Sequence, residues 1–163
     1  MKGPLIGVIG GSSATPEEAA LAEGVGRALA QADALLICGG RGGVMEAACK
    51  GARAGGGLTI GILPGGDRSE ANDYVDIAIA TGIGYARNAI IVRAADGVIA
   101  VGGSYGTLSE IGLALGYHKP LVGLWTWEMA REGHVEVPVA RAKTAEEAVK
   151  MILERVRSGG KRR

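Results

Sequence analysis

The sequence contains few aromatic residues and few cysteines. Among its 163 residues are two tryptophans, four tyrosines and no phenylalanine, so aromatic side chains make up 4% of the chain. The hydrophobic content of 47% must therefore come mainly from alanine, valine, isoleucine and leucine, which suits a tightly packed α/β sheet. Cys38 and Cys49 lack the CxxC spacing of zinc and redox sites. We expect both to be small buried side chains in a reducing compartment.

The chain also lacks a charge excess and a long apolar run. Its formal net charge is +1, whereas a general nucleic-acid binder usually carries a strong basic excess. No stretch reaches the roughly 20 apolar residues needed to span a bilayer, and the N-terminal apolar run is too short for a signal peptide. His118 and His134 stand alone, without a cluster of metal-ligand residues in the sequence around them. These features predict a cytoplasmic protein that has no metal site and binds neither nucleic acid nor membranes.

Short β-type runs alternate with longer helical runs along the chain. Strands are expected at 5–9, 34–38, 59–63, 75–81, 97–101 and 121–125, with a short edge strand at 134–139. Helices are expected at 16–32, 44–54, 85–95, 107–117 and 145–156, and Thr15 and Thr144 each begin a capping box. The alternation predicts one α/β domain over residues 1–158, doubly wound, with a mainly parallel sheet of six or seven strands and helices on both faces. Residues 159–163 are expected to form a basic C-terminal tail.

Glycine-rich segments follow four of the expected strands, at 10–13, 39–43, 82–84 and 102–106. Parallel strands place their carboxyl ends on one edge of the sheet, where exposed backbone N–H groups and helix N-termini bind anions. One such segment can be a turn that simply needs glycine, but four on one edge favour a phosphate-bearing ligand. The dinucleotide pattern GxGxxG is absent after the first strand, and the Walker pattern GxxxxGK[ST] is absent too. The candidate ligand-binding residues are Gly10, Gly11, Ser12, Gly39, Gly40, Gly42, Gly43, Met45, Gly102, Gly103, Ser104, Gly106 and Thr107.

Two of these segments resemble motifs of the Lonely Guy family, which belongs to the lysine-decarboxylase-like (SLOG) superfamily. Residues 39–46 (GGRGGVME) and 102–110 (GGSYGTLSE) are similar to its GGxxGxM and PGGxGTxxE motifs. The resemblance implies a Rossmann-like homodimer or higher homo-oligomer that needs no cofactor. It also implies cleavage of the N-glycosidic bond of nucleoside 5′-monophosphates rather than decarboxylation of lysine. By the same resemblance, Glu110 and Arg87 are the catalytic residues.

The residues themselves leave alternatives for these charged side chains. Glu110 either stabilises charge in a bound ligand or completes a capping box with Thr107. Arg87 lies in the first turn of an expected helix, where the macrodipole disfavours a cation, so we expect Glu110, a ligand phosphate or a surface carboxylate beside it. Arg41, inside the second glycine-rich segment, either reaches a phosphate or is solvated. Trp125 and Trp127 are expected at a dimer contact or in the core.

Two positions depart from the enzyme motifs. Val101 stands where the Lonely Guy motif has proline, and Asn88 stands where the family usually has lysine. These departures favour the related molybdenum cofactor carrier branch, which shares the fold and glycine loops and binds a phosphorylated pterin without known turnover. The sequence therefore predicts a binder of a nucleotide or another phosphorylated small molecule. It leaves open whether the protein hydrolyses a nucleoside monophosphate or carries a pterin, or whether the loops are only a scaffold for an interaction module.

Overall fold

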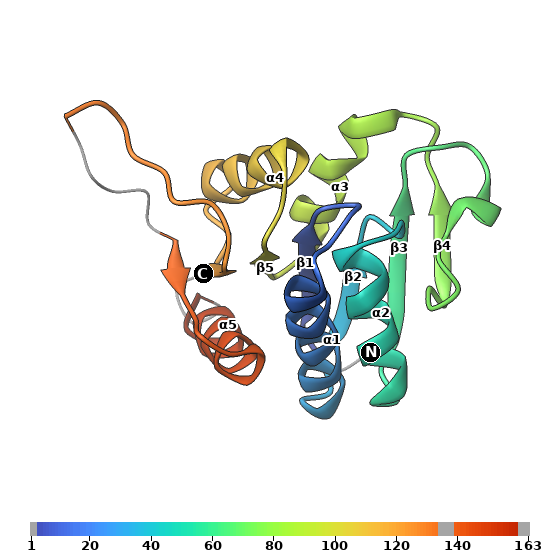
Figure 1. Cartoon of the computed structure of the whole chain (residues 1–163), viewed down its shortest axis with the longest axis horizontal. Coiled ribbons are helices and arrows are strands. Elements are labelled where there is room, and N and C mark those ends of the chain that lie inside the picture. Colours follow the sequence, from blue (N-terminus) through green and yellow to red (C-terminus); the bar gives the residue numbers. More distant parts are fainter. Residues whose placement is uncertain (1–2, 134–138, 160–163) are drawn as a thin grey trace.

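The computed structural model describes residues 3–133 and 139–159 and contains one seven-stranded sheet, in the order β4-β3-β2-β1-β5-β6-β7 (Figure 1). The strands are β1 Leu5–Gly10, β2 Leu35–Cys38, β3 Thr59–Leu63, β4 Ile77–Ala80, β5 Gly97–Val101, β6 Leu121–Leu124 and β7 Ala140–Arg141. Every pairing between neighbouring strands is parallel. The predicted doubly wound α/β sheet is confirmed.

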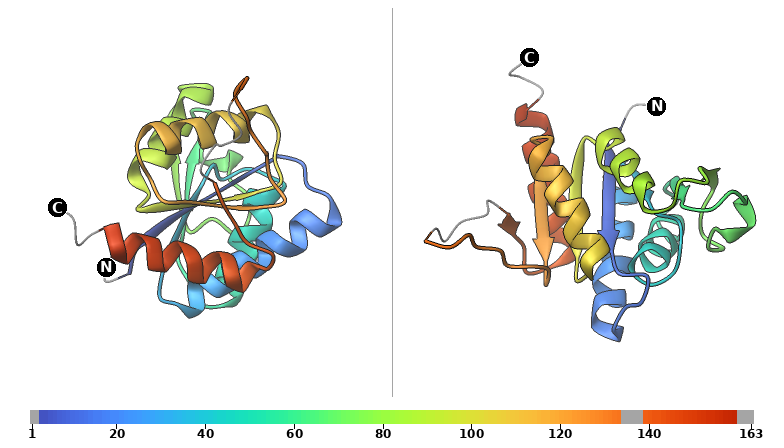
Figure 2. Two further views of the ribbon diagram at one scale, coloured as in Figure 1. Left: turned by 90° about the vertical axis from the view of Figure 1, so that its left-hand side faces the viewer. Right: turned by 90° about the horizontal axis from the view of Figure 1, so that it is seen from above.

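Helices cover both faces of the sheet (Figures 1 and 2). They are α1 Pro16–Gln31, α2 Val44–Ala54, α3 Arg87–Ala94, α4 Tyr105–Gly116 and α5 Ala145–Gly159, with short 3₁₀ turns η1 Arg68–Glu70 and η2 Gly84–Ala86. Helices α1, α2 and α5 lie on one face, and α3 and α4 lie on the other. Within the described residues, no helix combines the length and apolar character needed to cross a membrane.

The strands alternate their side chains between two apolar cores. In β1, Ile6 and Val8 pack into the core beneath α1, α2 and α5, while Ile9 packs on the opposite side with Ile91 and Ile111 of α3 and α4. Both cores consist almost entirely of aliphatic side chains, as the lack of phenylalanine requires. Burial on both faces explains why the strands read as continuous apolar runs.

The predicted capping box at α1 forms, whereas at α5 the Thr144 half forms and the Glu147 carboxylate instead accepts from the Lys143 amide at 2.8 Å. The Thr15 hydroxyl accepts a hydrogen bond from the Glu18 amide at 3.1 Å, and the Glu18 carboxylate accepts one from the Thr15 amide at 3.0 Å. At α5, the Thr144 hydroxyl accepts from the Glu147 amide at 3.1 Å. These side chains satisfy amides that have no partner within the helix and so fix where α1 and α5 begin.

One predicted strand needs correction, a second lies almost wholly outside the described residues, and one of two alternatives for Trp125 is excluded. The fourth strand is shorter than 75–81, because Val75 and Asp76 still belong to the turn that precedes Ile77. The predicted edge strand at 134–139 lies almost wholly outside the described residues, and the seventh strand is the adjoining β7, which pairs with β6. Trp125 is 66% exposed in this chain rather than part of its core, at a positive φ of 49° directly after β6.

The strand order changes direction at β1. The chain runs outward from β1 through β2 and β3 to β4, then returns to the other side of β1 with β5. At such a switch point the loops that leave neighbouring strands run to opposite faces, which opens a crevice beyond the carboxyl ends. Here the crevice lies beyond β1 and β5, where the first and last glycine-rich segments leave the sheet.

Candidate ligand-binding site

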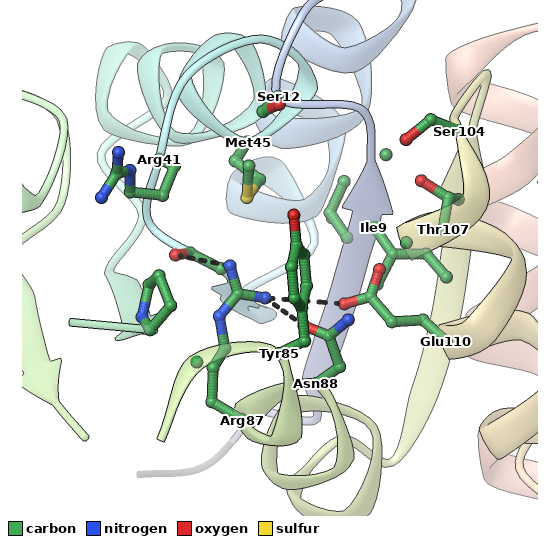
Figure 3. A pocket seen from close by; sticks show the side chains of 16 residues that line it. Ile9, Ser12, Arg41, Met45, Tyr85, Arg87, Asn88, Ser104, Thr107 and Glu110 are labelled. Atoms are coloured by element: carbon green, nitrogen blue, oxygen red, sulfur yellow. Dashed lines mark hydrogen bonds and ion pairs between the residues drawn. The ribbon is translucent and has the colours of Figure 1, made fainter. Parts of the chain in front are cut away.

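A cavity of about 370 Å³ lies beyond the carboxyl ends of the strands, and we call it the central cavity (Figure 3). Segments that follow β1, β2, β3, β4 and β5 all contribute to its wall. Its lining residues are Val8, Ile9, Gly10, Ser12, Gly39, Arg41, Met45, Pro64, Gly84, Tyr85, Arg87, Asn88, Ser104, Gly106, Thr107 and Glu110. The wall combines an apolar part with several convergent polar groups, as small-molecule sites usually do.

The structure divides the residues predicted from the sequence into two groups. Those that line the central cavity are Gly10, Ser12, Gly39, Met45, Arg87, Ser104, Gly106, Thr107 and Glu110. Those that belong to the same segments without lining it are Gly11, Gly40, Gly42, Gly43, Gly102 and Gly103. The structure brings the predicted segments together at one edge of the sheet, but the prediction treated all glycines of a segment as equivalent.

Residues 10–13 and 39–43, which we call the paired segments, pack against each other. The Val44 amide at the start of α2 donates to the Gly11 carbonyl at 3.0 Å. A Cβ atom on Gly43 would lie 2.3 Å from that carbonyl oxygen, and a Cβ on Gly10 would lie 2.4 Å from Cγ1 of Val44. Gly43 also has a positive φ of 65°. Gly43 is thus required by close backbone packing between the paired segments.

Residues 102–107, which we call the α4 segment, turn sharply from β5 into α4. Gly102 and Gly103 have positive φ values of 52° and 110°, so the helix begins at Tyr105, two residues before the predicted start. Thr107 therefore lies within the first turn, and the predicted capping box between Thr107 and Glu110 is wrong. The N-cap residue is Ser104, whose side chain makes no capping hydrogen bond.

The first turn of α4 faces the central cavity with an unpartnered hydroxyl. Thr107 is 2% exposed, and its Oγ1 has no hydrogen-bond partner among the described residues. Around Gly106, which lines the cavity, an added Cβ would meet nothing within 4 Å. The first amides of a helix also lack partners within the helix, and the macrodipole is positive there. This end of the central cavity has the geometry and charge for an anion.

Arg87 brings a positive charge into the same cavity. Its side chain is buried and comes from the first residue of α3. Nη1 donates to the Asn88 side-chain oxygen and lies 4.0 Å from Glu110 Oε1, while Nη2 donates to the Gly39 carbonyl at 3.5 Å (Figure 3). The Nε–H has no partner among the described residues. Of the alternatives considered for Arg87, a surface carboxylate is wrong, because the nearby carboxyl is the buried Glu110.

Glu110 lies in the second turn of α4, beside Arg87. Burial raises the pKa of Glu110 to about 8, although the Arg87 charge acts in the opposite direction. Burial also lowers the pKa of Arg87 from its ordinary value, and the Glu110 charge opposes this change. At neutral pH Glu110 is therefore mostly a neutral acid, whereas a guanidinium stays charged. The pair leaves the positive charge of Arg87 largely uncompensated.

Three other residues complete the site. Asn88, buried beside Arg87, accepts its hydrogen bond, and the sequence identified it only as a departure from a motif. Tyr85 on η2 lines the mouth of the cavity and was missed, although it follows the glycine-rich segment at 82–84. Arg41 also lines the cavity, where it forms an ion pair with Glu70 at 2.6 Å.

The two cysteines lie behind the paired segments. Their Sγ atoms are 3.5 Å apart, and both thiols are free and buried, as the sequence predicted. A hydrogen bond from the Cys49 thiol is the main cause of a lowered pKa at Cys38. Within residues 3–133 and 139–159, His, Cys, Asp and Glu side chains form no group of three or more that could hold a metal ion.

Comparison with known proteins places this chain in a family. A sequence model of the SLOG cluster4 family matches residues 3–154. The chain belongs to the SLOG cluster4 family. A protein of Archaeoglobus fulgidus that carries no functional name is 48% identical over 124 residues, which cover 76% of this chain and 82% of that protein. The resemblance to the SLOG superfamily inferred from the two glycine motifs is confirmed.

Solved structures of similar sequence show the same SLOG fold. The molybdenum cofactor binding protein of Rippkaea orientalis superposes with a TM-score of 0.86 at 40% identity, covering 96% of this chain and 99% of that chain. The molybdenum cofactor carrier protein of Chlamydomonas reinhardtii gives 0.83 at 34% identity, with the same shares covered. The predicted similarity to the carrier branch is therefore confirmed for both sequence and fold.

Proposed function

We propose that this protein binds a phosphorylated small molecule in the central cavity and acts as a carrier of a phosphorylated pterin of the molybdenum cofactor type. The observation that carries the proposal is the buried, unpartnered Thr107 hydroxyl in the first turn of α4, which lines the same cavity as the buried charge of Arg87. Polar groups buried without partners are rare in proteins because each costs free energy. A phosphate bound there would give both groups a partner.

The similar solved structures support the choice of a pterin. The proteins of Rippkaea orientalis and Chlamydomonas reinhardtii are described as binding or carrying the molybdenum cofactor, and each is covered almost completely by this chain. In this proposal the cofactor is cargo. Its phosphate would bind at the α4 segment, by the amides of the first turn, Thr107 and Arg87. The remaining volume of the cavity would hold the pterin ring.

Thermal unfolding and calorimetry in the presence of neopterin monophosphate, AMP and ribose 5-phosphate test this proposal. A ligand at about 100 times its Kd should stabilise the protein by about 2.7 kcal/mol, which raises Tm by roughly 5–10 °C for a chain of this size. Arg87→Gln should weaken binding by roughly tenfold or more, since a hydrogen bond to a charged group is lost. Arg93→Gln, on the same helix but outside the central cavity, is the matched control. If none of the three phosphates binds the wild type, the proposal is overturned.

A second candidate function is hydrolysis of the N-glycosidic bond of a nucleoside 5′-monophosphate. The observation that favours it is the neutral acid Glu110, which lines the central cavity beside Arg87. A carboxyl group with a pKa near 8 can donate a proton to a departing base, while water supplies the oxygen that bonds to the ribose. The products would be the free base and ribose 5-phosphate.

Chromatography of AMP incubated with the protein distinguishes this enzyme from the carrier. The enzyme should release adenine, and Glu110→Gln should abolish the release because it cannot donate the proton. Release of adenine at the same rate by wild type and Glu110→Gln would contradict the role of Glu110. Binding of AMP without release of adenine would contradict the enzymatic function and would be consistent with the carrier function.

We also propose that the protein is a homo-oligomer. Exposed isoleucines lie along β4, the segment after it and α3, at Ile77, Ile79, Ile83 and Ile90. Apolar side chains grouped in this way on a surface often mark a contact with another chain. Light scattering coupled to size-exclusion chromatography should give a mass of at least twice 16.5 kDa, and Ile90→Asp should reduce it. A wild-type mass of one chain would overturn this proposal.

A further inference from the structure

Tyr85 is the most exposed large side chain at the central cavity. Its side chain lines the cavity, yet the residue is 85% exposed. The other exposed tyrosine of this edge, Tyr105, is 81% exposed but packs against Trp127, with ring centroids 5.8 Å apart, and does not line the cavity. No such ring contact holds Tyr85 among the described residues. An aromatic ring thus stands at the mouth of the site with both its faces largely open.

The backbone holds Tyr85 in this position. The preceding residue, Gly84, has a positive φ of 60°, and its amide donates to the Pro64 carbonyl at 2.9 Å. The Gly82 amide donates to the Gly65 carbonyl at 2.9 Å, so the whole segment is tied to the loop after β3. Tyr85 is therefore fixed through its main chain, while its side chain has no role in packing the core.

The position of the ring complements the anion-binding end of the cavity. In the view of Figure 3 the Tyr85 side chain is drawn across the cavity, with Met45 and Arg87 to one side of it in the picture and Thr107 and Glu110 to the other; all five residues line the cavity. Met45 is 6% exposed and presents a thioether, which makes favourable contacts with aromatic rings. A ligand with its phosphate at Thr107 would place the rest of its structure within reach of this aromatic and thioether surface.

We propose that Tyr85 recognises the ligand's planar heteroaromatic ring by stacking on it, so that the cavity selects phosphates that carry such a ring over simple sugar phosphates. The inference rests on the proposed binding of a phosphorylated ligand, and it identifies Tyr85 as the residue that contacts the ligand's ring. Stacking tolerates any flat ring because every base or pterin offers a π face. Tyr85 acts by binding the ring and takes no part in any proton transfer.

Calorimetric titration of four proteins with two ligands tests the proposal. The proteins are wild type, Tyr85→Phe, Tyr85→Ala and the control Tyr105→Ala, and the ligands are AMP and ribose 5-phosphate, which differ only in the ring and its glycosidic bond. Tyr85→Ala should weaken AMP binding by roughly fivefold or more, since stacking of one base on an aromatic side chain is typically worth at least that factor. Its binding of ribose 5-phosphate should change by less than about twofold. Tyr85→Phe keeps the ring and should bind both ligands like the wild type, as should Tyr105→Ala.

The pattern of losses separates this inference from the proposed function. If AMP binds to the wild type and Tyr85→Ala binds it equally well, the role of Tyr85 is overturned while phosphate binding stands. If Tyr85→Ala weakens the binding of AMP and of ribose 5-phosphate by the same factor, the role of Tyr85 is also overturned, because Tyr85 would then not favour the ligand that carries the aromatic ring. If neither ligand binds the wild type, this inference and its basis in a phosphate ligand both fail. Neopterin monophosphate, whose fluorescence should be quenched on stacking in wild type but not in Tyr85→Ala, provides a second readout.

Discussion

The paired segments and the α4 segment are both rich in glycine, but the glycines serve different purposes. In the paired segments a Cβ on Gly43 would collide with the Gly11 carbonyl of the opposite segment, so the backbones require glycine in order to pack. At Gly106 of the α4 segment an added Cβ would meet nothing, and the residue lines the central cavity. Glycine at one place is a condition of folding, and at the other it leaves space that the protein itself does not fill.

The largest expected effect is on the paired segments. Gly43→Ala adds a Cβ 2.3 Å from the Gly11 carbonyl oxygen and forces a non-glycine residue to a φ of 65°. We expect the free energy of unfolding to fall by about 3–5 kcal/mol, because steric overlap and backbone strain add. Urea denaturation measures this change. A loss below about 1 kcal/mol would show that the paired segments can separate, and the comparison with the α4 segment would then lose its basis.

The next effect concerns Glu110 and pH. The pKa of Glu110 is about 8 in the folded protein and about 4.5 when unfolded, so the folded state binds more protons between these values. Stability should therefore fall as pH rises from 4.5 to 8, by roughly 2–3 kcal/mol between pH 5 and 7. Glu110→Gln should remove this part of the slope, whereas Glu17→Gln on the surface of α1 should keep it. Denaturation at several pH values checks the slope, and identical profiles for wild type and Glu110→Gln would contradict the prediction.

Thr107→Val tests the unpartnered hydroxyl in the α4 segment. The valine has nearly the same shape, so the free protein should become more stable by about 1 kcal/mol as a buried polar group without a partner is removed. Binding of ribose 5-phosphate should weaken by roughly fivefold for loss of one hydrogen bond. Thr126→Val is the matched control, because its hydroxyl donates to the Gly102 carbonyl at 2.6 Å and its removal should destabilise. A less stable Thr107→Val would show that the hydroxyl has a structural partner.

The smallest expected effect is at Gly106. Gly106→Ala should raise stability by roughly 0.5–1 kcal/mol, since alanine is the better helix former and its Cβ meets no atom. The same Cβ should weaken binding of ribose 5-phosphate. Gly112→Ala in the same helix also has open space around its Cβ but lies outside the central cavity, so it should stabilise without any loss of binding. If calorimetry shows that Gly106→Ala binds ribose 5-phosphate as tightly as the wild type, the ligand does not bind at the α4 segment.

Much of the fold could be predicted because local signals agree with the tertiary structure. The Thr15 and Thr144 capping boxes identified the starts of α1 and α5, and the aliphatic runs identified the strands. The start of α4 could not be predicted in this way. Thr107 has the spacing of a capping residue to Glu110, yet the positive φ values of Gly102 and Gly103 turn the chain into the helix two residues earlier.

The candidate site could be predicted in part for a related reason. The sequence shows which residues follow a predicted strand. This was enough to predict that Arg87, Glu110 and the glycine segments lie on one edge of the sheet. Which atoms then meet depends on packing between distant segments. Tyr85 carries no motif, and contact between Gly11 and Gly43 joins residues 32 positions apart, so neither was visible before the chain was folded.

The buried carboxyl of Glu110 couples anion binding to the binding of a proton. While Glu110 is neutral, the Arg87 charge is free to attract a phosphate; once Glu110 ionises, the new negative charge competes for the same guanidinium, 4.0 Å away. A phosphate bound nearby would repel an ionised Glu110 and so strengthen its hold on the proton. Loading of the site near pH 8 would therefore draw protons from the solvent, and release of the ligand would return them.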